Sequence, residues 1–207
     1  MKEIVKFIKE GLKITSKTKV NKKTKYNYHP KTKEELKNLI KQLIKERGNE
    51  GDFNDIDTSK ITDMSDLFFT MDKFNGDISN WDVSNVKNMT FMFFACESFN
   101  QDISNWNVSN VTDMRCMFDN CASFNQPLND WNVSKVTDMS FMFYGCELFN
   151  RSLANWDVSK VIDMNCMFYE CKSFNCDISN WDVSNVKYNK EIFKKCILEE
   201  KYRPKFK

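Results

Sequence analysis

Residues 99–123 read FNQDISNWNVSNVTDMRCMFDNCAS, and nearly the same wording returns every 25 residues along this 207-residue chain. Five such units fill residues 74–198, and a diverged unit at 49–73 precedes them with Ile56 in the tryptophan position. A fixed period of 20–50 residues is typical of solenoids and other repeat architectures. The period is clearest in the tryptophans, which are Trp81, Trp106, Trp131, Trp156 and Trp181.

The apolar positions of one unit predict a coil that contains a short strand and a short helix. We expect the strand around 99–104, a turn at Trp106 and the helix around 113–121, with Asp113 in the N-cap position. The expected fold class is therefore α/β, a leucine-rich-repeat-like solenoid of about 25-residue coils with one short parallel strand and one short helix in each. A pure parallel β-helix is the alternative. The residues that carry the helix prediction recur at i, i+3, i+4 and i+7: Met114, Met117, Phe118 and Cys121.

The net charge of +2 is the sum of three differently charged segments, which we take as the domain organisation. Residues 1–48 are a basic N-terminal helical segment and cap, residues 49–198 are the solenoid, and residues 199–207 are a basic tail. Residues 1–47 carry a net charge of +10, the repeats up to residue 186 carry −13, and the remainder carries +5. We expect an amphipathic helix at 3–14, then a basic linker, and a frayed C-terminus.

A helix at about 33–47 is expected to cover the open end of the first coil. Thr32 and Glu35 have the spacing of a capping box, and Gly48 follows as a stop signal. Terminal coils need such covers because an open stack end invites association with another chain. The apolar side of this helix is made of Leu36, Leu39, Ile40, Leu43 and Ile44.

Residue types that support catalysis are scarce, and we expect no enzyme, no cofactor and no metal site. His29 is the single histidine, and the chain has neither a glycine-rich phosphate loop nor a CxxC pair. Aspartates that recur once per unit, such as Asp113, are more typical of caps and turns than of acid–base pairs. The asparagines at 75, 100, 125, 150 and 175 are expected to stack and to bond backbone groups.

Five of the eight cysteines fall in one column of the repeat, whose counterpart in the diverged unit is Met71. Because methionine takes the place of cysteine in that unit, the column is interpreted as free thiols that pack in the apolar interior. Disulfide pairing in an exported protein and metal binding are the alternatives. The column consists of Cys96, Cys121, Cys146, Cys171 and Cys196.

Two surfaces are candidates for binding a partner. If 113–121 and its equivalents are helical, a set of aromatic residues lies away from the core, and exposed aromatic stripes often mark protein contacts. The alternatives are that these rings pack against neighbouring coils or that the helical phase differs. The first candidate face comprises Phe69, Phe91, Phe94, Phe141, Tyr144 and Tyr169. The second comprises Gln101, Gln126 and Arg151, which vary between nearly identical units.

Residues 1–47 offer a different kind of function. Their excess of lysine could bind nucleic acid or an anionic surface, or could simply be a solvated helix and linker. No apolar run is long enough for a transmembrane helix or a secretory signal. By its own sequence the chain is expected in the cytoplasm as a monomer.

The unit at 99–123 with its element M-F-x-x-C, together with the element W-D-V-S-N-V at 81–86 and 181–186, resembles the repeat of BspA-like leucine-rich-repeat surface proteins, which also occurs in mycoplasma lipoproteins. The similarity extends over about 28–196. It implies a leucine-rich-repeat-type solenoid without catalytic activity, and a location at the cell surface or outside the cell. The expected function is a non-enzymatic repeat scaffold for protein–protein interaction or adhesion, with a protein partner; nucleic-acid or anionic-surface binding through residues 1–47 is the alternative.

Overall fold

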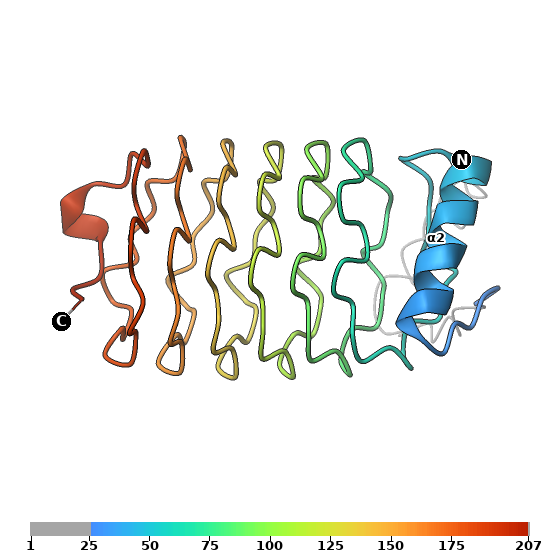
Figure 1. Ribbon diagram of the computed structural model, residues 1–207, viewed down its shortest axis with the longest axis horizontal. Helices are drawn as coiled ribbons and strands as arrows, with labels where there is room; N and C mark the ends of the chain where they lie inside the picture. Colours follow the sequence, from blue (N-terminus) through green and yellow to red (C-terminus); the bar gives the residue numbers. More distant parts are fainter. Residues whose placement is uncertain (1–25, 207) are drawn as a thin grey trace, which may run out of the picture.

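The computed structural model describes residues 26–206, which form a row of coils stacked side by side (Figure 1). Helix α2 (Lys33–Arg47) lies against the first coil, and the short 3-10 helix η2 (Glu200–Tyr202) lies beside the last. Neighbouring coils are joined by isolated parallel bridges between residues 25 apart, such as Asp113 with Asp138. The helix expected at 3–14 and most of the basic linker lie outside the described residues.

The expected α/β, leucine-rich-repeat-like fold class is wrong, because no coil contains the predicted strand or helix. Residues 115–120 form consecutive tight turns in place of the helix at 113–121. Two residues of this stretch have left-handed backbone conformations, Cys116 at φ 54° and Asn120 at φ 58°. A right-handed helix cannot contain such residues. The same two positions have positive φ in all six units.

The hydrogen bonds of these turns explain why the helix does not form. Alternate N–H groups donate to the next coil: Cys116 to the carbonyl of Ser140 at 2.9 Å, and Phe118 to that of Met142 at 3.0 Å. The intervening Met117 N–H donates three residues back to Met114. Half of the amides therefore join coils, and these bonds replace the i→i−4 bonds that a helix would need.

In the segment predicted to be a strand, side-chain oxygens accept the hydrogen bonds that backbone carbonyls would accept in a sheet. The Asn100 N–H donates to Oδ1 of Asn75 at 2.9 Å, and the Ser104 N–H donates to Oδ1 of Asp102 at 2.9 Å. The asparagine column continues this pattern along the array, as expected: Asn125, Asn150 and Asn175 each donate to the asparagine one coil earlier. Asp113 is no N-cap but forms a local turn with the N–H of Arg115.

The interior is a stack of aromatic rings that runs through every coil. Phe118 is fully buried, and its ring centroid lies 4.2 Å from that of Phe124 and 5.7 Å from that of Phe143, both of which belong to the next unit. Such ring pairs stabilise by about 0.5–1.5 kcal/mol beyond the burial of their area. Met114, Met117, Phe118 and Cys121 are all 0% exposed, so the apolar spacing gave the correct interior although no helix is present.

In the four units that fill residues 74–173, two buried polar groups per coil hold the stack in register. The indole N–H of Trp131 donates to the carbonyl of Ile103 at 3.2 Å, and the thiol of Cys121 donates to the carbonyl of Phe93 at 2.9 Å. Equivalent bonds recur along the array, each spanning 28 residues. Since they bond the preceding coil, these groups can be buried without leaving an unsatisfied donor.

Helix α2 caps the first coil. Its Thr32 side chain accepts from the Glu35 N–H at 3.2 Å, and its buried residues Leu36, Ile40 and Leu43 face the core. Arg47, in its last turn, donates to both carboxylate oxygens of Asp55 at 2.7 and 3.0 Å.

The C-terminal residues up to 206 are folded against the last coil, so the expectation of a frayed end is wrong for them. The guanidinium of Arg203 donates twice to the carbonyl of Leu198, at 2.7 and 3.0 Å, and lies over the ring of Phe193. Pro204 is buried, and the N–H of Ile178 donates to the carbonyl of Tyr202 at 3.1 Å.

Candidate interaction surface

The turns place the six aromatic residues of the first candidate face together on the outside of the stack, and we call this set the aromatic strip. Phe69 is 41% exposed, and the other five are half-buried. Their rings pair along the array: Phe69 stacks on Phe94 and Tyr144 on Tyr169, each pair with centroids 4.8 Å apart. The strip comprises Phe69, Phe91, Phe94, Phe141, Tyr144 and Tyr169.

Rings of the strip also pair within single coils, which gives the strip its width. Phe91 and Phe94 meet edge to face at 5.7 Å, and Phe141 and Tyr144 lie 5.9 Å apart. The guanidinium of Arg115 sits over the ring of Phe91, 5.3 Å from its centroid. The strip is therefore a surface of partly exposed ring faces that already accepts a cation of the chain itself.

The second candidate face is a single column whose side-chain ends are engaged with the preceding coil. Gln101 donates to the carbonyl of Asn75 at 2.9 Å, and Arg151 donates through Nε to the carbonyl of Asn125 at 2.9 Å. Gln126 makes the equivalent bond to Asn100 at 2.9 Å. These residues contribute to the joining of coils.

Asp119 interrupts the aromatic strip and is not among the residues predicted from the sequence. Its column reads Phe69, Phe94, Asp119, Tyr144, Tyr169 from coil to coil. Backbone bonds fix this register, since the Ala95 N–H donates to the carbonyl of Asp119 and the Asn120 N–H donates to that of Tyr144. Comparing the columns of the repeat would have revealed the substitution, but its burial depends on the neighbouring coils.

The Asp119 carboxyl lies in an unusual environment for an acid. Asp119 is 6% exposed, and burial raises the pKa of its carboxyl to about 7. Asn120 Nδ2 donates to Oδ1 at 2.7 Å, and the neighbouring Cys116 thiol opposes the rise. Burial in turn raises the pKa of the Cys116 thiol to about 12. No lysine or arginine within residues 26–206 forms an ion pair with Asp119.

All eight cysteines are free thiols, as the packing interpretation predicted. Cys96, Cys121, Cys146 and Cys171 are 0% exposed, and burial raises the pKa of each thiol. Because the thiolate is the reactive form, these four thiols are chemically inert in the folded chain. In the part of the chain that the structure describes, no group of three or more metal-ligating side chains is close enough to hold an ion.

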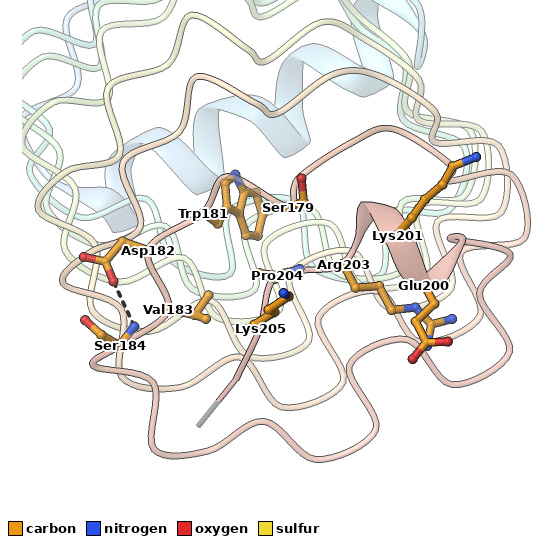
Figure 2. A pocket seen from close by; sticks show the side chains of 10 residues that line it. All are labelled: Ser179, Trp181, Asp182, Val183, Ser184, Glu200, Lys201, Arg203, Pro204 and Lys205. Carbon is orange, nitrogen blue, oxygen red and sulfur yellow. Dashed lines mark hydrogen bonds between the residues drawn. The ribbon is translucent and has the colours of Figure 1, made fainter.

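A hollow of about 670 Å³ lies between the last coil and the C-terminal residues (Figure 2). Trp181 and the turn of Asp182 and Ser184 form one side, and Lys201 and Arg203 belong to the other. The Ser184 N–H donates to Oδ1 of Asp182 at 3.0 Å, and Lys201 pairs with Glu199 at 2.8 Å. These polar groups are engaged in turns and ion pairs, and the hollow shows no nucleophile activated by a neighbouring base.

The described part of the basic N-terminal segment carries lysines on helix α2. Lys37 is half-buried, and Lys41 and Lys45 are exposed. Their spacing of four residues places them along one side of the helix. Within residues 26–206, no helix has the length and apolar character to cross a membrane.

Comparison with known proteins identifies the family. A family described as "Mycoplasma protein of unknown function, DUF285" matches residues 35–147 and 126–201. The chain belongs to the DUF285 family. The matched ranges begin in α2 and end in η2, so the match covers most of the helical cap as well as the repeats. No curated protein and no solved structure matches the chain.

Proposed function

We propose that this DUF285 protein is a non-enzymatic repeat scaffold that binds another protein through the aromatic strip. The observation that carries the proposal is the strip itself. Six partly exposed aromatic side chains are gathered on one surface of a rigid stack, in ring pairs 4.8–5.9 Å apart. Aromatic residues dominate the binding energy of protein interfaces because they bury a large area at a small entropy cost.

The construction of the array supports the same proposal. Ladders of hydrogen bonds and buried rings fix the backbone of every coil, so the outward columns vary without changing the frame. A rigid surface loses little entropy on binding, which favours recognition over an extended area. The resemblance to BspA-like surface proteins adds adhesion at a cell surface as the setting for this function.

The test is affinity capture from cells that make the protein, with the full chain as bait. A variant with Phe94→Ser, Tyr144→Ser and Tyr169→Ser removes four of the strip's ring pairs and leaves only that of Phe69 with Phe91. Each interfacial aromatic typically contributes about 2 kcal/mol, so the bound partner should be lost. A matched control with Leu148→Ser and Ile162→Ser, exposed apolar residues outside the strip, should still bind. Retention of every partner by the triple variant would contradict the proposal.

A second function, binding of nucleic acid or an anionic surface, is favoured by the lysines of α2. Lys37, Lys41 and Lys45 lie along one side of the helix. Electrophoretic retardation of DNA or RNA by the full chain at two salt concentrations tests this proposal. A salt-sensitive shift that is lost when the three lysines are replaced by Gln supports it, and no shift at low salt rules it out.

A further inference from the structure

The end of the array opposite α2 exposes a row of backbone donors (Figure 1). In every earlier coil, four alternate N–H groups of the tight turns donate to carbonyls of the next coil. In the unit at 149–173 these donors are Met164, Cys166, Phe168 and Glu170, with bonds of 2.8–2.9 Å. The equivalent N–H groups of the last coil have no acceptor within residues 26–206. We call them the donor row, and they belong to Asn189, Glu191, Phe193 and Lys195.

The donor row differs from the edge of a β-sheet, because no free acceptor lies between its donors. Every carbonyl from residue 190 to residue 194 accepts a hydrogen bond from within the chain. A sheet edge presents N–H and C=O groups in alternation and therefore pairs with another strand. A row of donors alone carries partial positive charge and suits a ligand that supplies acceptors only, such as a set of carboxylates.

Open space borders the donor row. A hollow of about 500 Å³ is lined by Asn189 and Phe193 from the last coil and by Pro204 and Phe206 from the C-terminal residues. Asn189 is exposed and Phe193 is half-buried, whereas the equivalent residues of the preceding coil are 0–1% exposed. The C-terminal residues therefore cover only part of the last coil, and a ligand can approach the donors.

The side chains around the donor row are predominantly basic. Residues 187–206 contain seven lysines and arginines and three glutamates. Lys187 and Lys190 are exposed and form no ion pair in the described part of the chain. Glu191, the acidic residue within the row, is already paired with Lys194 at 2.6 Å. An anionic ligand is therefore attracted by the side chains as well as by the backbone.

We infer that the donor row binds an acidic segment of another protein, whose carboxylates accept from the row and pair with Lys187 and Lys190. The acidic array of a second copy is a poorer ligand, because its aspartates already accept backbone N–H groups, as Asp102 does from Ser104 at 2.9 Å. Two donor rows would repel each other, since both are basic. The inference goes beyond the proposed function, because it assigns a second surface with a ligand of different chemistry.

The donor row adjoins the aromatic strip, so one partner can contact both surfaces. The ammonium groups of Lys194 and Lys195 lie over the ring of Tyr169, at 5.6 and 5.5 Å from its centroid. A protein bound along the strip would thus meet the donor row at this end of the array if an acidic segment extended from its interface.

The test is NMR of the backbone amides of the full chain, with acetyl-octaglutamate amide as the probe. In the free chain the amides of the donor row should exchange rapidly with solvent, whereas those of Cys166 and Phe168, which bond the last coil, should be protected. Octaglutamate should shift the donor-row signals in a saturable way and slow their exchange about tenfold at saturation, as expected for hydrogen bonds to a charged acceptor. The uncharged octaglutamine amide should not bind.

Two variants test the contribution of the lysines. Lys187→Gln with Lys190→Gln should weaken octaglutamate binding about fivefold, because exposed ion pairs each contribute modestly. The matched control, Lys41→Gln with Lys45→Gln, removes the same charge from α2 at the other end of the array and should leave binding unchanged. All four lysines are exposed, so both variants should fold.

Four outcomes would overturn the inference. Protected donor-row amides in the free chain would show that the chain covers its own row, and equal binding of octaglutamine would show that charge is not selected. Tighter binding of a single-stranded RNA of equal charge would assign the row to nucleic acid. Concentration-dependent shifts of these amides without peptide would identify a second copy as the ligand. None of these results bears on the aromatic strip, whose function is tested separately by capture with the triple serine variant.

Discussion

The buried carboxyl of Asp119 should make the stability of the folded array decrease as pH rises from 5 to 8. Burial raises its pKa from 3.8 to about 7 in the folded chain. The folded state then binds more protons than the unfolded state between these values, so raising the pH lowers the free energy of unfolding. The stabilisation by the protonated carboxyl is complete below pH 3.8 and is lost as pH rises through 7.

The size of this effect follows from linkage. A shift of about three pKa units corresponds to about 4 kcal/mol over the whole titration, at 1.36 kcal/mol per unit. The part that falls between pH 5 and 8 is about 2–3 kcal/mol, because the last two units of the shift lie in this window. This is a sizeable fraction of the 5–15 kcal/mol by which a domain of this size is ordinarily stable.

Urea unfolding of the wild type and of Asp119→Asn at pH 5 and pH 8 measures the effect. The variant carries a neutral amide at all pH values, so its free energy of unfolding relative to wild type should increase by about 2–3 kcal/mol from pH 5 to pH 8. Arg47 lowers the pKa of Asp55, and Asp55 and the remaining aspartates are common to both proteins, so their contributions cancel in this comparison. Asp130→Asn, the control, should follow the wild type. If Asp119→Asn shows the same pH dependence as the wild type, Asp119 does not titrate in this window and the reasoning is refuted.

Three further predictions concern the interior. Trp131→Phe should lower the free energy of unfolding in urea titrations by about 1–3 kcal/mol, because the carbonyl of Ile103 loses its buried donor. An unchanged urea midpoint would show that this hydrogen bond does not contribute to stability. Phe118→Ala should cost about 3–5 kcal/mol through the cavity between stacked rings, and a loss below 1 kcal/mol would contradict the ring-stack core. Thiol titration should find three reactive cysteines in the folded protein and eight in urea, and reaction of more than three in the folded state would contradict the burial of the other five. The three are Cys166, Cys176 and Cys196.

The period and the interior could be read from the sequence, whereas the coil conformation could not. Apolar residues at i, i+3, i+4 and i+7 face one side of a helix, but a run of tight turns also brings Met114 and Phe118 inside. The left-handed positions that distinguish the two are occupied by residues such as Cys116 and Phe141, which have no preference for that conformation. Only the neighbouring coils, by accepting the alternate N–H bonds, favour the turns over the helix.

The two ends of the array differ in the same way: the N-terminal helix is predicted by local sequence signals, whereas the C-terminal structure depends on tertiary contacts. Helix α2 was predicted from its capping box and apolar spacing, both of which are local signals. The C-terminal residues carry no such signal, since the two bonds that Arg203 makes to the carbonyl of Leu198 and its contact with Phe193 appear only when the last coil has formed. Asp119 belongs with the second group, because its pKa depends on burial by neighbouring coils.

The left-handed turns also determine which columns can carry recognition. A left-handed conformation costs a non-glycine residue roughly 1–2 kcal/mol, and this cost is offset because the N–H of that residue bonds the next coil, as Phe91 bonds Arg115 at 2.9 Å. The bond uses backbone alone, so the side chain at this position is free to differ between coils. In the described array this column changes from Asp66 through Phe91 and Cys116 to Glu191, while the buried column of Phe118 is phenylalanine in all six units. The chemistry of the surface can therefore change one coil at a time without altering the frame.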